Sequence, residues 1–282
     1  MTASLLGQKA LAPSTLATYH RALSLYTDFM MSVFHSNEFF PISNRHALAF
    51  ITYLYAKGLN GSTITTYLSA ISFYCKMLGI HDPTNTFPAR KLLTALKRTN
   101  GSPDSRLPIS PEILGKLLSL IPATGLNIFG QLLFSAMYLL AFSAFLRVGE
   151  FTTKSNGNPK LILQIEDITF TKQDSIHYHM QIAIKHFKGN VTATPVFIII
   201  PMSNNPSMCP VRAILQYLHM RGNKPGPLFV WESGLPVHRE QFARMLKLNL
   251  RLAGLAADDF KGHSFRIGAC SFASSCGIPM TK

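Results

Sequence analysis

One apolar stretch, "IFGQLLFSAMYLLAFSAFL" at residues 128–146, most constrains the fold, because so many apolar side chains must be removed from water. The run is about long enough to cross a bilayer. However, polar residues such as Gln131 interrupt it, and Arg147 and Glu150 follow it closely. We therefore predict a helix that ends near Glu150 and is buried in a globular core, and we expect no membrane partner.

The first third of the chain has the periodicity of helices. Apolar residues recur at steps of three and four behind Ser14, a predicted N-cap, and again in "NRHALAFITYLYAKG", which ends at Gly58. A third helix is predicted from Ser62 and a fourth over "ARKLLTALKR". The segment "RTNGSPDSRLPISPE" then breaks the pattern with turn-forming residues. We therefore predict two domains, a helical bundle at 1–104 and a second domain at 105–282.

The second domain has a mixed pattern. Ser110 and Pro111 are typical of a helix start. Three runs rich in branched and aromatic residues follow the apolar stretch, "LILQIEDITF", "IHYHMQIAIK" and "TPVFIIIP", and they predict strands. Helical periodicity returns in "CPVRAILQYLHMRG", in "REQFARMLKLNLRLAGL" and at the end of the chain. The predicted fold class is mainly α with a small antiparallel β-sheet (α+β).

The chain is strongly basic. Its net charge is +14 at pH 7, and basic residues are spread over both halves. This favours a polyanionic partner, with nucleic acid ahead of a membrane surface, although charge can also serve solubility alone. The four cysteines form no CxxC pair and no zinc-like spacing with histidine, so we expect buried free thiols and neither a metal nor a cofactor.

Three short segments could carry chemistry. "FLRVGE" contains Arg147 and Glu150, "IKHFKGN" contains Lys185 and Lys188, and "GHSFR" contains His263 and Arg266. Each has a structural alternative: a helix-end ion pair, two solvated lysines, and a capping histidine with a surface arginine. Taken together, two arginines, a lysine and a histidine suit the transition state of phosphoryl transfer. The arginines would neutralise phosphate oxygens, and the lysine or histidine would protonate the departing oxygen.

These motifs resemble those of the tyrosine recombinase (phage integrase) family, in particular its eukaryotic mobile-element branch of DIRS-like and Crypton-like recombinases. "STITTYLSAISFYCKMLG" is similar to the family's DNA-clasping core-binding domain, and "LLAFSAFLRVGEF" resembles its first-arginine motif. "CPVRAILQYLHMRG" and "GPLFVWESGLPVHREQFARMLKLNLRLAGL" are similar to the connecting region, and "HSFRIGACSFASSCGIP" resembles the His-x-x-Arg box.

The resemblance implies roles for individual residues. Arg147, His263 and Arg266 take the catalytic positions, and Glu150 supports Arg147. The hairpin lysine is matched best by Lys188, with the nearby Lys185 as the alternative. The surroundings of both lysines differ from the family's usual Ser-Lys-Thr-Asp-like setting.

The resemblance also implies a mechanism and partners. Intact members attack a DNA phosphate with a tyrosine and form a 3′-phosphotyrosyl intermediate, without a metal or a small-molecule cofactor. Residues 1–104 become a core-binding domain and residues 105–282 a catalytic-like domain, which together clasp double-stranded DNA. The resemblance further implies a homo-oligomer on DNA. The sequence itself gives no location, and a eukaryotic source would favour the nucleus.

The expected nucleophile is not found downstream of the His-x-x-Arg box. The last tyrosine of the sequence is Tyr217, and none follows Arg266. We therefore expect a catalytic-like domain that is incomplete at its C-terminus, with exposed apolar surface around Phe272 and Ile278. The alternative is a non-catalytic DNA-binding module derived from a mobile element.

A polypeptide of this sequence should not cleave DNA, because it offers no tyrosine in the expected place. The measurement is incubation of the purified chain with a nicked suicide substrate that traps covalent protein–DNA adducts, resolved on a denaturing gel. A band of adduct that survives denaturation would contradict this expectation.

Overall fold

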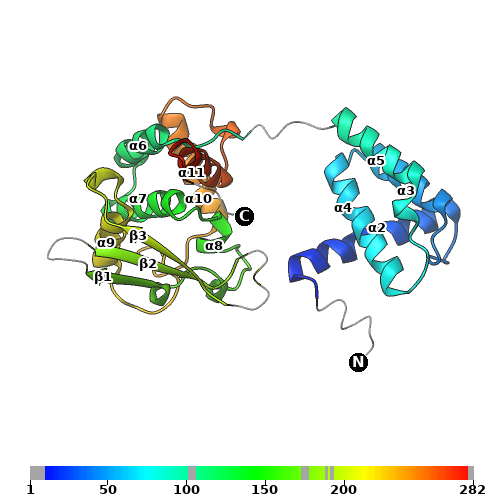
Figure 1. The fold of residues 1–282 in the computed structure, drawn as a ribbon, viewed down its shortest axis with the longest axis horizontal. Helices are drawn as coiled ribbons and strands as arrows, with labels where there is room; N and C mark the ends of the chain where they lie inside the picture. Colours follow the sequence, from blue (N-terminus) through cyan, green and yellow to red (C-terminus); the bar gives the residue numbers. More distant parts are fainter. Residues whose placement is uncertain (1–9, 101–105, 173–177, 188–189, 191–193, 279–282) are drawn as a thin grey trace. The chain divides into compact units, whose positions relative to one another are not determined.

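The computed structural model describes residues 10–100, 106–172, 178–187, 190 and 194–278. The chain divides into two compact units, Met1–Asp104 (unit 1) and Ser105–Lys282 (unit 2) (Figure 1). Each unit has a hydrophobic core of its own, and each is described by itself.

Unit 1 is a bundle of four α-helices in its described part. They are α2 (Pro13–Phe34), α3 (Asn44–Ala56), α4 (Gly61–Met77) and α5 (Phe87–Asn100). The Ser43 side chain caps α3 and the Asn60 side chain caps α4, each by accepting a backbone N–H from the first turn. The prediction that Ser14 caps the first helix is wrong. Ala12 is the N-cap, because Pro13 already fits the first helical position, where no N–H is needed.

Aromatic packing forms the centre of unit 1. Tyr26 and Phe29 from α2 meet Phe50 from α3, and the Tyr26 and Phe50 rings lie edge to face with centroids 5.2 Å apart. Ile64 and Ile71 of α4 close the same cluster, with side chains that are almost fully buried. Most of each helical stripe predicted from the sequence therefore faces one core, whereas the stripe residues Val33 and Leu78 near two helix ends are exposed.

Unit 2 combines helices with one small sheet, as the sequence predicts. Its elements are α6 (Pro111–Leu120), α7 (Ile128–Ser143), α8 (Val148–Phe151), β1 (Ile168–Lys172), β2 (Tyr178–Ile184), β3 (Val196–Pro201), α9 (Pro210–Arg221), α10 (Arg239–Leu252) and α11 (His263–Ser275). The strands are antiparallel in the order β1-β2-β3, and α9 packs against β2 and β3. The predicted fold class, mainly α with a small antiparallel sheet, is confirmed.

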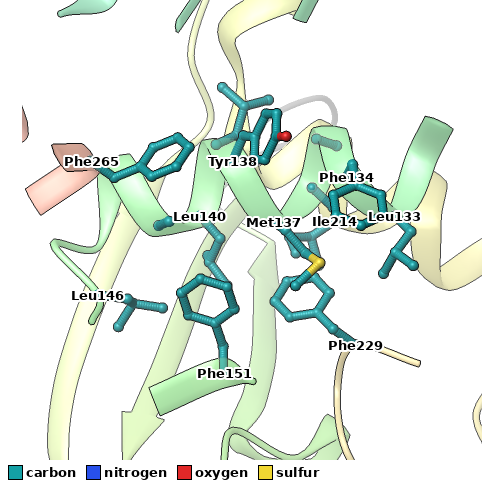
Figure 2. Close-up of a cluster of buried hydrophobic side chains, with 14 of the residues drawn as sticks. Leu133, Phe134, Met137, Tyr138, Leu140, Leu146, Phe151, Ile214, Phe229 and Phe265 are labelled. Carbon is teal, nitrogen blue, oxygen red and sulfur yellow. The ribbon is translucent and has the colours of Figure 1, made fainter. Parts of the chain in front are cut away.

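Helix α7 is the centre of unit 2. Its residues Phe134, Met137 and Tyr138 are fully buried, and Figure 2 shows side chains from other elements around them, including Phe229 and Phe265. Apolar burial on this scale is the main stabilising contribution to such a fold. In the described part of the chain, none of the helices combines the length and the apolar character needed to cross a bilayer.

The apolar helix ends earlier than predicted. It stops at Ser143, because Phe145 adopts a left-handed conformation with φ of 54°. The N–H of Leu146 then donates to the carbonyl of Ala141 at 3.1 Å, and the N–H of Phe145 to that of Phe142 at 3.3 Å. This is the hydrogen-bond pattern of a Schellman motif. Arg147 and Glu150 therefore do not end α7, and instead they begin the separate short helix α8.

Two further predictions need correction. The first β-like run, residues 161–170, forms a strand only at its end, because the Asp167 carboxylate accepts the Gln164 N–H and closes a 3-10 turn at Ile165–Asp167. The four cysteines are free, as predicted, but only Cys75 and Cys209 are buried. Phe272 and Ile278 are exposed, as expected.

We predict that Gly268→Ala destabilises unit 2 by at least about 2 kcal/mol. A Cβ on Gly268 would overlap the backbone carbonyl of Ile109, which cannot rotate away as a side chain can. Urea unfolding followed by fluorescence of Trp231, the only tryptophan of the chain, measures this unit alone.

Gly115→Ala is the matched control, because a Cβ there would touch only the sulfur of Met208 at 3.9 Å. That change should leave the free energy of unfolding unchanged or raise it by up to about 1 kcal/mol, through the higher helix propensity of alanine. Equal effects of the two substitutions would contradict the close approach of α11 to Ile109.

Candidate functional site

The candidate site is built around the turn between α7 and α8. Arg147 is the N-cap of α8, and Glu150 is its third helical residue. One Glu150 carboxylate oxygen accepts the backbone N–H of Arg147 at 2.8 Å, and the other accepts a guanidinium N–H of Arg147 at 3.0 Å. The Glu150 side chain is 9% exposed and that of Arg147 is 39% exposed. A buried carboxylate therefore orients a guanidinium that still reaches solvent.

Arg266 reaches the same turn from α11. Its guanidinium donates a hydrogen bond to the carbonyl of Phe145 at 3.1 Å. Phe145 lies two residues before Arg147 in the chain, so the two arginines that the sequence predicts for the site meet at one turn. The half-buried Arg266 side chain also supplies a partner for the carbonyl of a residue in a strained conformation.

His263 is the first residue of α11, three positions before Arg266, as the sequence predicts. The preceding residue, Gly262, lies so close to Val148 of α8 that a Cβ there would overlap the valine side chain. The start of α11 therefore packs directly on the helix that Arg147 caps. The structure thus brings the segments of Arg147, His263 and Arg266 together.

The structure describes one of the two candidate hairpin lysines, Lys185. Lys188 lies outside the described residues. Lys185 directly follows β2, and its ammonium forms an ion pair with the buried carboxylate of Asp167. This hydrogen bond from Lys185 to Asp167 raises the pKa of the lysine. Lys185 and Asp167 line a small cleft together with Glu150, so the base of the hairpin lies near the turn that holds Arg147.

Sequence reasoning missed two charged residues at this place. The exposed Arg239, at the start of α10, lies against Gly149 of α8, where a Cβ would overlap its guanidinium. Asp167 holds Lys185. Both are far in the sequence from the residues they meet. The only local signal was the lack of a side chain at Gly149, and one glycine alone does not identify a contact.

The two tyrosines that most closely precede the His-x-x-Arg box in the sequence, Tyr217 and Tyr178, lie in α9 and β2. Tyr217 is fully buried, and its hydroxyl bonds to the backbone of Leu228 and Val230. Burial raises the pKa of Tyr217 to about 12. Tyr178 is half-buried in β2. The hydroxyl of Tyr217 is therefore held in the core of unit 2.

The chemistry of the cluster is that of an anion site. Guanidinium groups present several fixed N–H donors, which match the oxygens of carboxylates and phosphates. Within the described residues, no group of three or more His, Cys, Asp or Glu side chains is arranged to hold a metal ion. The cations around the α7–α8 turn are thus the chemically distinctive feature of unit 2.

Comparisons with known proteins cover most of the chain. Residues 2–78 match the sequence profile of the phage integrase N-terminal SAM-like domain. The chain is 27% identical to an integrase/recombinase xerD homolog of Selenomonas ruminantium, in an alignment that covers 96% of this chain and 76% of the relative.

Solved structures share the fold. A Tn1549 transposon integrase in complex with transposon right-end DNA is similar with a TM-score of 0.60 and 17% identity, over 99% of this chain and 88% of the integrase. The XerH site-specific recombinase bound to its palindromic substrate is similar with a TM-score of 0.58 and 16% identity, over 92% and 69% of the two chains.

We predict that Glu150→Ala lowers the free energy of unfolding of unit 2 by about 1–2 kcal/mol. Most of this loss comes from the cap on the Arg147 backbone, because water screens the half-exposed guanidinium. Trp231 fluorescence in urea measures it. Glu240→Ala, which removes an exposed acid from the first turn of α10, should change stability by no more than about 0.5 kcal/mol. Equal losses would contradict the anchoring role of Glu150.

Proposed function

Because the chain belongs to the tyrosine recombinase (phage integrase) family, we propose that it acts in DNA recombination by binding duplex DNA and holding a backbone phosphate at the α7–α8 turn. The observation that carries the proposal is the convergence of Arg147 and Arg266 on this turn from two helices. The DNA complexes of the similar Tn1549 integrase and XerH structures support duplex DNA as the partner.

The guanidinium groups have capacity left for a phosphate. Each guanidinium carries five N–H donors. Glu150 engages one guanidinium nitrogen of Arg147, and the Phe145 carbonyl engages one guanidinium nitrogen of Arg266. The anchoring contacts fix the arginines before DNA arrives, which lowers the entropy cost of binding the phosphate.

We assign the remaining roles by chemistry. Arg147 and Arg266 would neutralise the non-bridging phosphate oxygens, and His263 would carry or donate a proton next to them. A hairpin lysine, Lys188 or Lys185, would protonate the departing oxygen. Glu150 would be a positioning residue, because it acts through its contact with Arg147.

Unit 1 would supply the second contact with DNA. Its match to the integrase N-terminal domain supports a role as the core-binding domain, and the net charge of +14 over the whole chain suits a partner with a phosphate backbone. A homo-oligomer on DNA stays a prediction.

We predict that duplex DNA binds this chain with an affinity that falls steeply as salt rises, and that Arg147→Ala weakens binding several-fold. The lost phosphate contact should reduce the slope of log affinity against log salt by about one. Fluorescence anisotropy of a labelled duplex, titrated at several potassium chloride concentrations, measures both quantities.

Lys247→Ala is the matched control for net charge. Lys247 is already paired with Asp258, and it lies about two turns along α10 from Arg239. Its removal should change affinity much less than that of Arg147. An affinity that is flat across salt, or equal losses in the two variants, would contradict the proposal.

A further inference from the structure

Two buried carboxylates line one small cleft of unit 2, and each is paired with a cation that reaches solvent. Glu150 is 9% exposed and its partner Arg147 is 39% exposed. Asp167 is 4% exposed and its partner Lys185 is 42% exposed. The second pair repeats the arrangement of the first, with a lysine in place of the arginine.

The two pairs are connected through the backbone. The N–H of Leu163 donates to the carbonyl of Glu150 at 2.8 Å, which ties residue 163 to the end of α8. Four residues later, one oxygen of Asp167 accepts the N–H of Gln164 at 2.9 Å, so the 3-10 turn itself fixes the carboxylate. The position of the Lys185 ammonium is therefore coupled to the helix that Arg147 caps.

We propose that Asp167 is a positioning residue that holds the Lys185 ammonium at the phosphate site, in the way that Glu150 holds Arg147. The inference rests on the proposed function and deepens it: Lys185, at the base of the hairpin, contacts a DNA phosphate. No residue pattern in the sequence singles out Asp167 for this role.

The physical argument concerns the freedom of the lysine chain. A lysine has a flexible four-carbon stem, and ordering it costs up to about 2 kcal/mol of side-chain entropy. Pairing with a rigid buried carboxylate orders the stem before DNA binds. The ammonium has three donors, so an ion pair leaves capacity for a phosphate oxygen. The carboxylate also raises the pKa of Lys185, which keeps the group protonated.

Two other roles for Asp167 predict different results. If Asp167 only neutralised Lys185, removing the carboxylate would free a cation and strengthen DNA binding. If the pair were only structural, its loss would lower the free energy of unfolding of unit 2, and DNA binding would weaken only in variants that lose stability. Positioning predicts weaker DNA binding that depends on Lys185.

The test measures the affinity for a labelled duplex in Asp167→Asn, Lys185→Met and the double variant. Asparagine keeps an oxygen that can accept the Gln164 N–H. By Coulomb's law alone, loss of a negative charge near DNA raises affinity. The proposal expects the opposite, a fall of roughly three- to tenfold for each single variant. In the Lys185→Met background, Asp167→Asn should cause no further fall.

Glu166→Gln is the matched control, because Glu166 is the exposed neighbour of Asp167 and also raises the pKa of Lys185. It should leave affinity unchanged or raise it. Trp231 fluorescence in urea checks that each variant is folded. If Asp167→Asn does not fold, Asp167→Glu replaces it and should retain at least half of the affinity, since the carboxylate is kept.

The outcomes separate the inference from the proposed function. Unchanged or tighter DNA binding by Asp167→Asn overturns the inference, as does a Lys185→Met variant with unchanged affinity. The inference also fails if Asp167→Asn lowers the affinity equally with and without Lys185, or if Asp167→Glu does not retain binding. Arg147→Ala reports on the function itself. If Arg147→Ala weakens binding while the Lys185 variants do not, the proposed function stands and the inference fails; if none weakens binding, both fail.

Discussion

The candidate site depends on one left-handed residue, Phe145. A residue other than glycine in this conformation costs about 1–2 kcal/mol, and here it stops α7 and turns the chain into α8. The turn places Arg147 at a helix N-cap, where Glu150 can reach both its backbone and its side chain. Arg266 donates to the carbonyl of Phe145, so the side chain proposed to bind phosphate also stabilises the turn that positions its partner.

Buried acids explain how a cluster of cations can form inside unit 2. Like charges repel, and a half-buried guanidinium or ammonium loses hydration, so each group needs a nearby opposite charge. Glu150 and Asp167 supply it from the protein side and leave the solvent side of each cation for a ligand. The acids thus determine where the cations lie, while the cations determine which ligand suits the site.

The sequence predicts what local periodicity encodes. The fold class and α6 follow from helical spacing and turn residues. The break between α7 and α8 could not be predicted, because Phe145 is not a residue that normally signals a left-handed turn. Arg239 and Asp167 were missed because each meets its partner through tertiary packing across a large sequence separation, which periodicity does not report.

Two glycines explain why the short spacing of His263 and Arg266 becomes a fixed geometry. Gly262 lies against Val148 and Gly268 against the carbonyl of Ile109, each at a distance that excludes a side chain. The two predicted site residues of α11 lie between these contacts, so the rotation and the axial position of the helix are set by close approach on both sides of them. Ordinary side-chain packing would tolerate small shifts of a helix, whereas the close contacts of Gly262 with the Val148 side chain and of Gly268 with the Ile109 backbone leave little room for them. The geometry of the candidate site therefore depends on the absence of side chains at Gly262 and Gly268 as well as on its charged residues.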